Sequence, residues 1–248
     1  YHSATLLPDG RVLIAGGRDN SISSHSHAIA ELYDPVTDTF SLTGSLNEDR
    51  AGHTATLLPD GRVLIVGGAQ TTIPGHAIPL RICELYDPST GTFTVAGETA
   101  SQHSGHTATL LKNGKVLIVG GWYAHPELYD PVAGTFGMAG SLITPRGSHT
   151  ASLLPDGRVL LAGGAIAIGP VTTSSAELYD PFANSFTATE SMGQARQQHT
   201  ATLLRDGSVL AAGGYGGADL SGSELFVPRY VAAPADIKPR FCPNELST

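Results

Sequence analysis

The chain repeats one unit of about 50 residues five times, and this repetition limits the fold more than any other feature. The segment YHSATLLPDGRVLIAGG begins at residue 1, and matching segments begin at 52, 105, 148 and 198. A variable stretch follows each of them, and then ELYDP or, in the last unit, SELFVP. The steps between the aligned histidines are 51, 53, 43 and 50 residues, so insertions fall inside a fixed unit. Such a repeat predicts an array of small sheets that pack on their neighbours.

Each unit has the pattern of four strands. An Asp-Gly or Asn-Gly pair separates two apolar runs, which predicts a hairpin with a two-residue type I′ turn. The second strand, such as VLIV at 63–66, is apolar on both faces and must be buried between layers. Polarity rises through a third strand, AELYD, to a fourth that alternates Phe40 and Leu42 with hydroxyl residues. This gradient is typical of a propeller blade whose outermost strand meets water.

A double glycine ends every second strand and predicts a positive φ or a backbone contact that a Cβ would block. With ELYDP and the aromatic residue after the turn, residues 1–228 resemble the Kelch repeat in its bacterial form, which carries LLPDGRVL. The resemblance implies an all-β, Kelch-type β-propeller with five four-stranded units, part of a ring of six or seven blades. The tryptophan frequent in Kelch units is replaced by phenylalanine, which can fill the same apolar position: Phe40, Phe93, Phe136 and Phe186.

The last residues depart from the repeat. We expect the propeller over 1–228, with units starting near 1, 52, 105, 148 and 198, and RYVAAPADI as the only candidate for the last fourth strand. Residues 229–248 are proline-rich and would be a linker or the start of a further module. Their DIKPRFCPN resembles the DIKPGxxPN segment that opens a module in some bacterial secreted proteins. That resemblance implies an extracellular or cell-envelope location.

Composition and net charge limit the classes of partner that the chain is expected to bind. The 14 Lys and Arg against 22 Asp and Glu give a net charge of -8, which disfavours nucleic acid and anionic membrane. No apolar run is long enough to predict membrane insertion. Cys83 and Cys242 cannot form a disulfide framework, and Cys83 takes the small-residue position of Ala30 and Ala176, which predicts a core cysteine. Oligomeric state is left open.

The antiparallel order assigns the ends of the strands to two faces. The start of each first strand, the double glycines and the variable loops share one, the variable-loop face, and the Asp-Gly and Asp-Pro turns share the other, the turn face. The loops span roughly 18–29, 69–82, 122–125, 165–175 and 215–222. Variable loops on a rigid scaffold are the expected place for function. The candidate ligand-binding residues in them are Trp122, Tyr123, His125 and Tyr215.

Trp122 and Tyr123 could stack on a sugar or a peptide side chain. The alternative is that they only pack the short third loop.

Histidines recur at the start of the first strand: His2, His53, His106, His149 and His199. A ring of them could bind a metal or an anion, but neighbouring copies would lie too far apart for metal bonds of about 2 Å. We expect each instead to bond backbone between blades.

A partial cationic collar precedes four of these histidines by three residues: Arg50, His103, Arg146 and Arg196. The collar could bind a carboxylate ligand. The alternative is that each arginine pairs with an acid of a neighbouring blade, such as Glu31, Glu84, Glu127 or Glu177.

Catalysis has little support in the residues. Tyr1-His2-Ser3 before LLPDGRVL resembles the segment of galactose and glyoxal oxidases in which adjacent tyrosine and histidine bind copper, and only Tyr1 and His2 would carry over. That family also needs a cysteine–tyrosine crosslink and a histidine from a later domain. GxSxG, HExxH, paired CxxC and phosphate-binding glycine motifs do not occur in the sequence. We expect neither a catalytic residue nor a cofactor.

We therefore expect a secreted or envelope-associated binding or scaffold propeller that recognises a protein, peptide or carbohydrate through the variable-loop face. The alternatives are a propeller enzyme, either a copper oxidase fragment or a sugar enzyme of the sialate mutarotase kind, and a purely architectural spacer.

Overall fold

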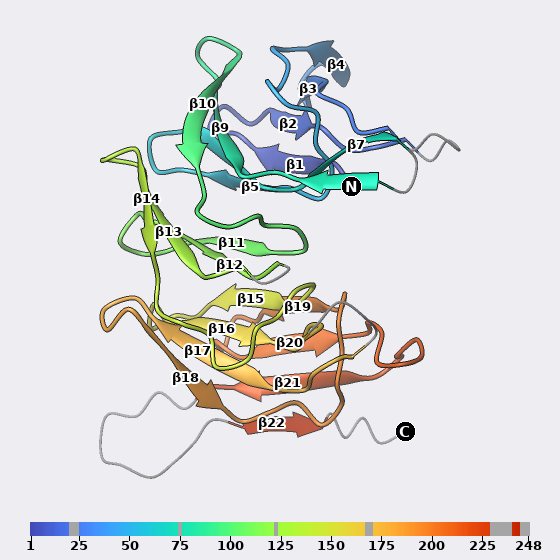
Figure 1. Ribbon diagram of the computed structural model, residues 1–248, viewed down its shortest axis with the longest axis vertical. Helices are drawn as coiled ribbons and strands as arrows, with labels where there is room; N and C mark the ends of the chain where they lie inside the picture. The colour runs from blue at the N-terminus through green and yellow to red at the C-terminus, as the bar shows by residue number, and fades with distance from the viewer. Residues whose placement is uncertain (20–24, 74–75, 122–123, 167–170, 229–239, 244–248) are drawn as a thin grey trace. The chain divides into compact units, whose positions relative to one another are not determined.

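The computed structural model describes residues 1–19, 25–73, 76–121, 124–166, 171–228 and 240–243. These residues form five antiparallel four-stranded sheets and one two-stranded hairpin (Figure 1). The chain divides into two compact units, Tyr1–Met138 and Ala139–Thr248, which are treated separately here. Within the described residues, no helix is long and apolar enough to cross a membrane.

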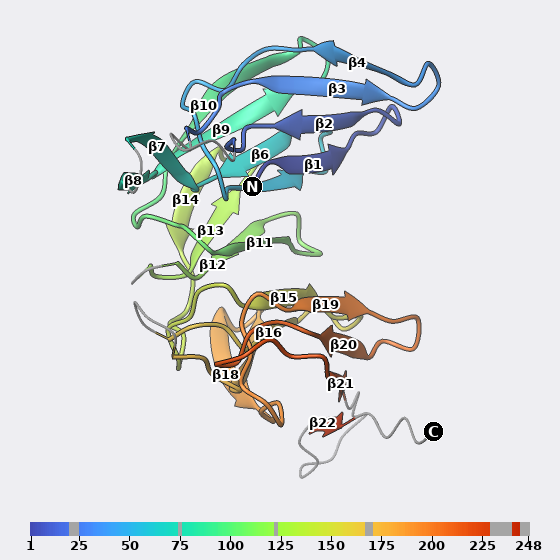
Figure 2. The ribbon, with the colours of Figure 1, turned by 90° about the vertical axis from the view of Figure 1, so that its right-hand side faces the viewer.

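The first unit holds three of the sheets, and Figure 2 shows the order of the first of them. The first contains β1 (Ser3–Leu6), β2 (Val12–Ala15), β3 (Ala30–Asp34) and β4 (Thr39–Leu42). The second contains β5 (Thr54–Leu57), β6 (Val63–Val66), β9 (Ile82–Asp87) and β10 (Thr92–Glu98). The third contains β11 (Thr107–Leu110), β12 (Val116–Val119), β13 (Glu127–Asp130) and β14 (Thr135–Met138). A hairpin of β7 (Ala69–Ile73) and β8 (His76–Pro79) is inserted between β6 and β9.

The second unit holds the other two sheets. The fourth sheet contains β15 (Thr150–Leu153), β16 (Val159–Ala162), β17 (Ala176–Asp180) and β18 (Ser185–Thr189). The fifth contains β19 (Thr200–Leu203), β20 (Val209–Ala212), β21 (Ser223–Val227) and β22 (Arg240–Pro243). The last strand is therefore not RYVAAPADI, whose residues lie outside the described ranges. It comes from RFCP, four residues of the segment predicted to be a linker or further module, paired antiparallel to β21.

The buried layers follow the predicted gradient. Every residue of β6, β12 and β16 is buried, whereas all four residues of β4 are exposed. The first strands lie beside one another within each unit, β1 by β5, β5 by β11, and β15 by β19. Side chains from consecutive sheets then fill the space between them, as Val63, Ile65 and Phe93 pack with Leu13 and Leu32. The prediction that second strands are core and fourth strands meet water is confirmed.

The Asp-Gly hairpins differ from the predicted type I′ turn. In the first, Gly10 donates its amide to the Leu7 carbonyl and Leu7 donates to the Arg11 carbonyl, which gives a three-residue loop. Only the glycine has a positive φ, +90° at Gly10, whereas a type I′ turn needs two such residues. Pro8 suits a type I turn because its ring fixes φ near −65°, but the feature common to all five units is an Asp or Asn whose Oδ1 accepts the amide two residues on, as Asp9 does from Arg11 at 3.0 Å. The units with Lys112 and Arg205 at the proline position keep the same hydrogen bonds.

Two sequence predictions about packing are confirmed, and a third, on the phenylalanines, holds only in part. Both glycines of the pair have positive φ, as at Gly16 (+61°) and Gly17 (+105°), and a Cβ on Gly16 would lie 2.7 Å from the Arg50 carbonyl oxygen. Cys83 is fully buried in an apolar cluster, and burial raises the pKa of its thiol to about 12. Phenylalanine packs between sheets in the second and third blades, whereas Phe40 is 60 % exposed.

Two residues just before the first strand hold a left-handed backbone at a position where other repeats have glycine. Ser148 and Gln198 have φ of +52° and +54°, whereas Gly52 and Gly105 both have φ of +68°. A side chain in this left-handed region lowers stability by about 1 kcal/mol or more. Replacing it by glycine removes that cost, but part of the gain is lost because glycine is more flexible in the unfolded chain. We expect Ser148→Gly and Gln198→Gly each to raise the free energy of unfolding by about 0.5–1 kcal/mol in urea denaturation.

The matched control is Ser152→Gly within β15, where glycine should instead lower stability. A loss of stability in both Ser148→Gly and Gln198→Gly would contradict the strain argument.

Candidate functional site at the variable loops

Each variable loop starts beside the beginning of its own first strand. Isolated bridges join Ala51 to Ala69, Gly147 to Ala165, and Gln197 to Tyr215. The second glycine of the pair closes each loop further by accepting an amide from its far end, as Gly164 does from Thr173 at 2.9 Å. The same bond joins Gly17 to His27, Gly68 to Leu80, and Gly214 to Leu220. The start of the first strand, the glycines and the loops thus share one face, as predicted.

In the first unit two of these loops are docked on each other. The Ser26 amide donates to the Thr71 carbonyl, and the Thr71 amide donates to Ser26 Oγ at 2.9 Å. Both side chains are buried, 6 % exposed, although they come from loops of different sheets. The β7–β8 hairpin is therefore a fixed part of the face, and its exposed residues, His76 to Ile78, stand on a rigid support.

The cationic collar lies in the interior rather than at a surface. Arg50, Arg146 and Arg196 are at most 1 % exposed, and each forms an ion pair with a glutamate of the third strand that follows it. The distances are 2.6 Å to Glu84, 2.6 Å to Glu177 and 2.7 Å to Glu224. The alternative prediction, in which each arginine pairs with an acid, therefore describes these contacts.

The same arginines fasten both ends of the variable loops. Arg50 Nη1 donates to the carbonyl of Gly67, before the second loop, and to that of Ile82, after it, at 3.0 and 2.9 Å. Arg146 does so with Gly163 and Ser175, and Arg196 with Gly213 and Gly222. A planar guanidinium can serve two carbonyls and a carboxylate at once because its five N–H groups form a fixed fork. We call each such side chain with its glutamate a loop clamp.

The glutamate of each clamp also holds the linker that leads into its sheet. Glu177 accepts the amides of Ile143 and Thr144 at 2.8 and 2.9 Å, and Glu84 accepts those of Asn47 and Glu48. Burial lowers the pKa of Arg146, and the charge and hydrogen bond of Glu177 oppose that effect. Linker, third strand and loop ends are therefore tied together in the repeats that contain an arginine clamp.

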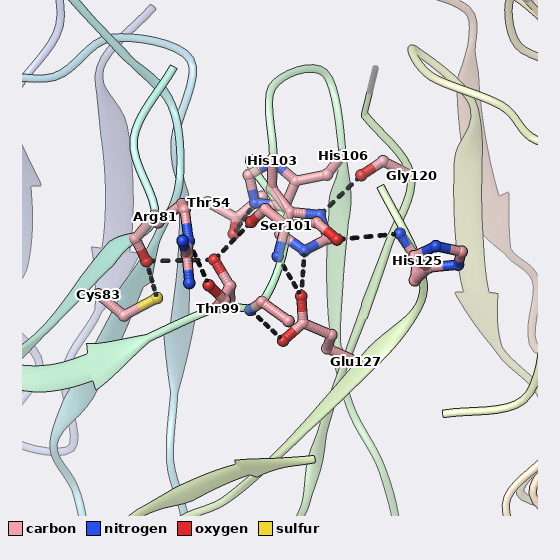
Figure 3. Close-up of polar contacts among 11 residues, drawn as sticks. Thr54, Arg81, Cys83, Thr99, Ser101, His103, His106, Gly120, His125 and Glu127 are labelled. Atoms are coloured by element: carbon pink, nitrogen blue, oxygen red, sulfur yellow. Dashed lines mark hydrogen bonds and ion pairs between the residues drawn. The ribbon is translucent and has the colours of Figure 1, made fainter. Parts of the chain in front are cut away.

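One clamp uses histidine. His103 is fully buried, and its Nδ1 and Nε2 lie 2.7 Å from the Gly120 carbonyl oxygen and 3.1 Å from Glu127 Oε1 (Figure 3). Unlike the arginines, the ring reaches only one end of its loop. The other end is held by Ser101, whose Oγ accepts the His125 amide at 3.3 Å.

The recurring histidines join adjacent sheets through hydroxyl groups. Nε2 of His53, His106 and His199 bonds to Ser3, Thr54 and Thr150, at 2.8, 2.9 and 3.0 Å. The predicted backbone partner is thus replaced by a side chain of the preceding first strand. His2 is exposed, whereas the other four histidines are buried.

Burial, followed by the charge of the nearby clamp arginine, lowers the pKa of His53 and His199 to about 4 and of His149 to about 3. These histidines are neutral packing groups at neutral pH.

The neutral histidines predict sensitivity to acid. His149 in the unfolded chain takes up a proton near pH 6.5, whereas the folded protein resists it down to about pH 3. Its contribution to stability is therefore complete above pH 6.5 and is lost as the pH falls from there toward 3. In urea denaturation we expect His149→Gln to lose about 2 kcal/mol less than wild type between pH 7 and pH 4.5. An identical loss in both proteins would contradict a buried neutral ring.

The remaining candidates are scattered. Tyr215 is half-buried against Gln197 and His125 is exposed, whereas Trp122 and Tyr123 lie outside the described residues. Tyr1 is 67 % exposed, with the Arg18 guanidinium 3.9 Å from its ring centre. Among the described residues no three His, Cys, Asp or Glu side chains gather as a metal site would require.

The turn face of the first unit carries two open grooves of about 470 and 430 Å³ between neighbouring turns. Their charged groups are engaged locally, since Asp60 pairs with Arg62, Asp9 with Arg11, and Lys115 with Asp130. This agrees with turns whose residues serve the fold.

The sequence prediction missed Glu224 and the loop-end carbonyls. Glu224 occupies the place of the ELYDP glutamate in SELFVP, so an alignment of all five third strands would have identified it. The role of the carbonyls was not visible, because each arginine meets them 17 residues and about 30 residues later through the fold alone.

The comparisons with known proteins bear on the fold. No family model and no curated protein sequence matches the chain. Among 313 similar chains of solved structures, one described as "Structure of YjhT" has a TM-score of 0.76 and 16 % identity. The match covers 92 % of this chain and 81 % of that one. The fold is a Kelch-type β-propeller. The five four-stranded sheets are its blades, and the likeness at this identity concerns the architecture.

Proposed function

We propose that this propeller is a binding or scaffold protein that recognises a protein, peptide or carbohydrate ligand through its variable-loop face. The observation that carries the proposal is the loop clamp. In three blades a buried arginine bonds the carbonyls at both ends of the variable loop, and a backbone bond closes the same loop. What lies between the two ends can change in length and sequence without disturbing the blade, as binding loops on a scaffold require.

The charged residues of the repeats support a binding role over a catalytic one. Arg50, Arg146 and Arg196 are engaged with their glutamates in the clamps, and the buried histidines His53, His149 and His199 are neutral. Functional sites usually combine a cleft with titratable groups whose partners leave them able to react. Here the variation lies instead in exposed loop residues, which points to recognition.

The test is a binding screen with loop replacements. The wild-type chain would be applied to a glycan array and to a displayed peptide library, and every hit measured by surface plasmon resonance. One variant replaces the β7–β8 hairpin by a short Gly-Ser turn, and a second does so for 216–219, with all clamp residues retained. We expect at least one graft to weaken binding about tenfold or more, since few residues carry most of an interface.

The control changes the turn face, with Val132→Ser and Phe182→Ser, whose side chains are 96 % and 100 % exposed. Binding that survives both grafts but is lost in this control would place the ligand on the turn face. Turnover of galactose, aldehydes or sialic acid by the wild-type chain, lost in Tyr1→Phe or in a loop graft, would replace the proposal by an enzymatic one.

A further inference from the structure

The clamp of the third blade differs from the other three in the side chain that pairs with the glutamate. Arg50, Arg146 and Arg196 keep their proton at any physiological pH, whereas the corresponding residue is His103, and an imidazole can exist with one or with two N–H groups. His103 occupies the same place, three residues before the recurring histidine, and bonds the glutamate of its own third strand, Glu127. It is fully shielded from water.

Both ring nitrogens of His103 face acceptors. Nδ1 lies 2.7 Å from the Gly120 carbonyl oxygen and Nε2 lies 3.1 Å from a Glu127 carboxylate oxygen (Figure 3). A neutral imidazole has one N–H, so only the protonated ring can donate to both. Loss of the proton leaves a lone pair facing an acceptor in a site without water, which is a costly arrangement.

The groups around the ring keep the negative charge on Glu127. Burial acts to raise the pKa of Glu127, but hydrogen bonds from His103 and from the Ala100 and Ser101 amides outweigh it and lower the pKa. The other titratable neighbours are His106, whose ring centre lies 5.4 Å away, and Cys83 of β9, whose buried thiol stays neutral. At the end of β6, the Gly68 amide donates to the His103 carbonyl, and Gly67 lies against the same residue.

The same short linker holds both ends of the third loop. His103 binds Gly120 at its start, and Ser101, two residues earlier, accepts the His125 amide at its end. The Ser101 amide in turn donates to Glu127, at 3.1 Å. A change at His103 is therefore transmitted to both loop ends through three residues of linker.

We propose that His103 is a proton-dependent clamp, which fastens Gly120 and, through the linker, His125 when its ring is protonated and loosens both as the pH rises. If the proposed function holds, ligand binding by this part of the face will be stronger in mildly acidic than in alkaline solution. The other three clamps, being arginines, remain fastened throughout.

The experiment needs no ligand. Amide hydrogen exchange, corrected for the intrinsic rate at each pH, would be followed between pH 5.5 and 8.5 in wild type and His103→Arg. In wild type we expect protection at Gly120, Gly121, Ala124 and His125 to fall about tenfold or more as the pH rises, because one buried hydrogen bond is lost. In His103→Arg protection should stay constant, as should that of Gly213, Gly214 and Leu220 at the Arg196 clamp in both proteins.

Flat protection in wild type, or an equal fall in His103→Arg, would overturn the proposal. Should the arginine variant fail to fold, nitrogen NMR of the wild-type ring decides, because both nitrogens must be protonated at pH 5.5 and one must lose its proton as protection falls. A ring that is neutral at every pH would also overturn it. A failed binding screen leaves these outcomes untouched, so the two proposals can fail separately.

Discussion

Replacing Arg146 by alanine should lower the free energy of unfolding by about 3–5 kcal/mol, the usual effect of leaving one partner of a buried ion pair without the other. Arg146 is 1 % exposed, and its removal would leave the buried carboxylate of Glu177 without its cationic partner and take one donor from each of the carbonyls of Gly163 and Ser175. Urea denaturation followed by fluorescence or circular dichroism gives the difference directly. Arg146→Lys should fall between, because an ammonium cannot span both carbonyls and the carboxylate.

The control is Arg158→Ala in the same blade. Arg158 also pairs with a carboxylate, Asp156, at 2.6 Å, but both side chains are partly exposed. Such surface pairs contribute about 1 kcal/mol or less. Equal losses in Arg146→Ala and Arg158→Ala would show that the clamp is no more than a surface pair.

Gly16→Ala should be clearly more damaging than the same substitution at a glycine with a similar backbone but open space around it. The new Cβ would lie 2.7 Å from the Arg50 carbonyl oxygen and 2.8 Å from His53 Cε1, and φ is +61°. The left-handed backbone costs about 1–2 kcal/mol with a side chain, and forcing a methyl into a filled space costs about 1–3 kcal/mol more. We expect a loss of about 2–5 kcal/mol in thermal or urea denaturation.

Gly52→Ala separates the two causes. Gly52 has nearly the same backbone, with φ of +68°, but a Cβ there would meet nothing within 4 Å. It should therefore show the conformational cost alone, about 1–2 kcal/mol. If Gly16→Ala were no worse than Gly52→Ala, the close contact between blades would have no energetic weight.

The repeat allowed most of the fold to be predicted because its signals are local. The apolar run of β6, the double glycine and the small residue at Cys83 each reflect a requirement of the residue itself, and all three predictions hold. The type I′ turn was wrong because the strand pairing leaves three residues between Leu7 and Arg11, and Asp9-Gly10 alone does not reveal that register.

The clamps were harder to predict because they depend on several segments at once. Arg50 could be matched with a glutamate by its regular position, but its contacts with Gly67 and Ile82 exist only after the loop has been closed between them. The hydroxyl partner of His53, Ser3, lies 50 residues away in the preceding blade. His53, His106 and His199 do join neighbouring sheets, as expected, yet nothing in the spacing distinguished a hydroxyl partner from a backbone carbonyl.

The clamps also define where this gene could be cut and joined without harm. Each arginine or histidine stands in the linker before its blade, while its glutamate and the two loop ends lie in the blade itself. A cassette cut at the edge of the first strand would separate Arg50 from Glu84 and leave two buried charges for the host to neutralise. A cassette cut a few residues earlier, before Asn47, would keep Arg50 and Glu84 in the same segment. Recombination between such repeats should therefore succeed at the fourth strand's exit and fail at the first strand's start.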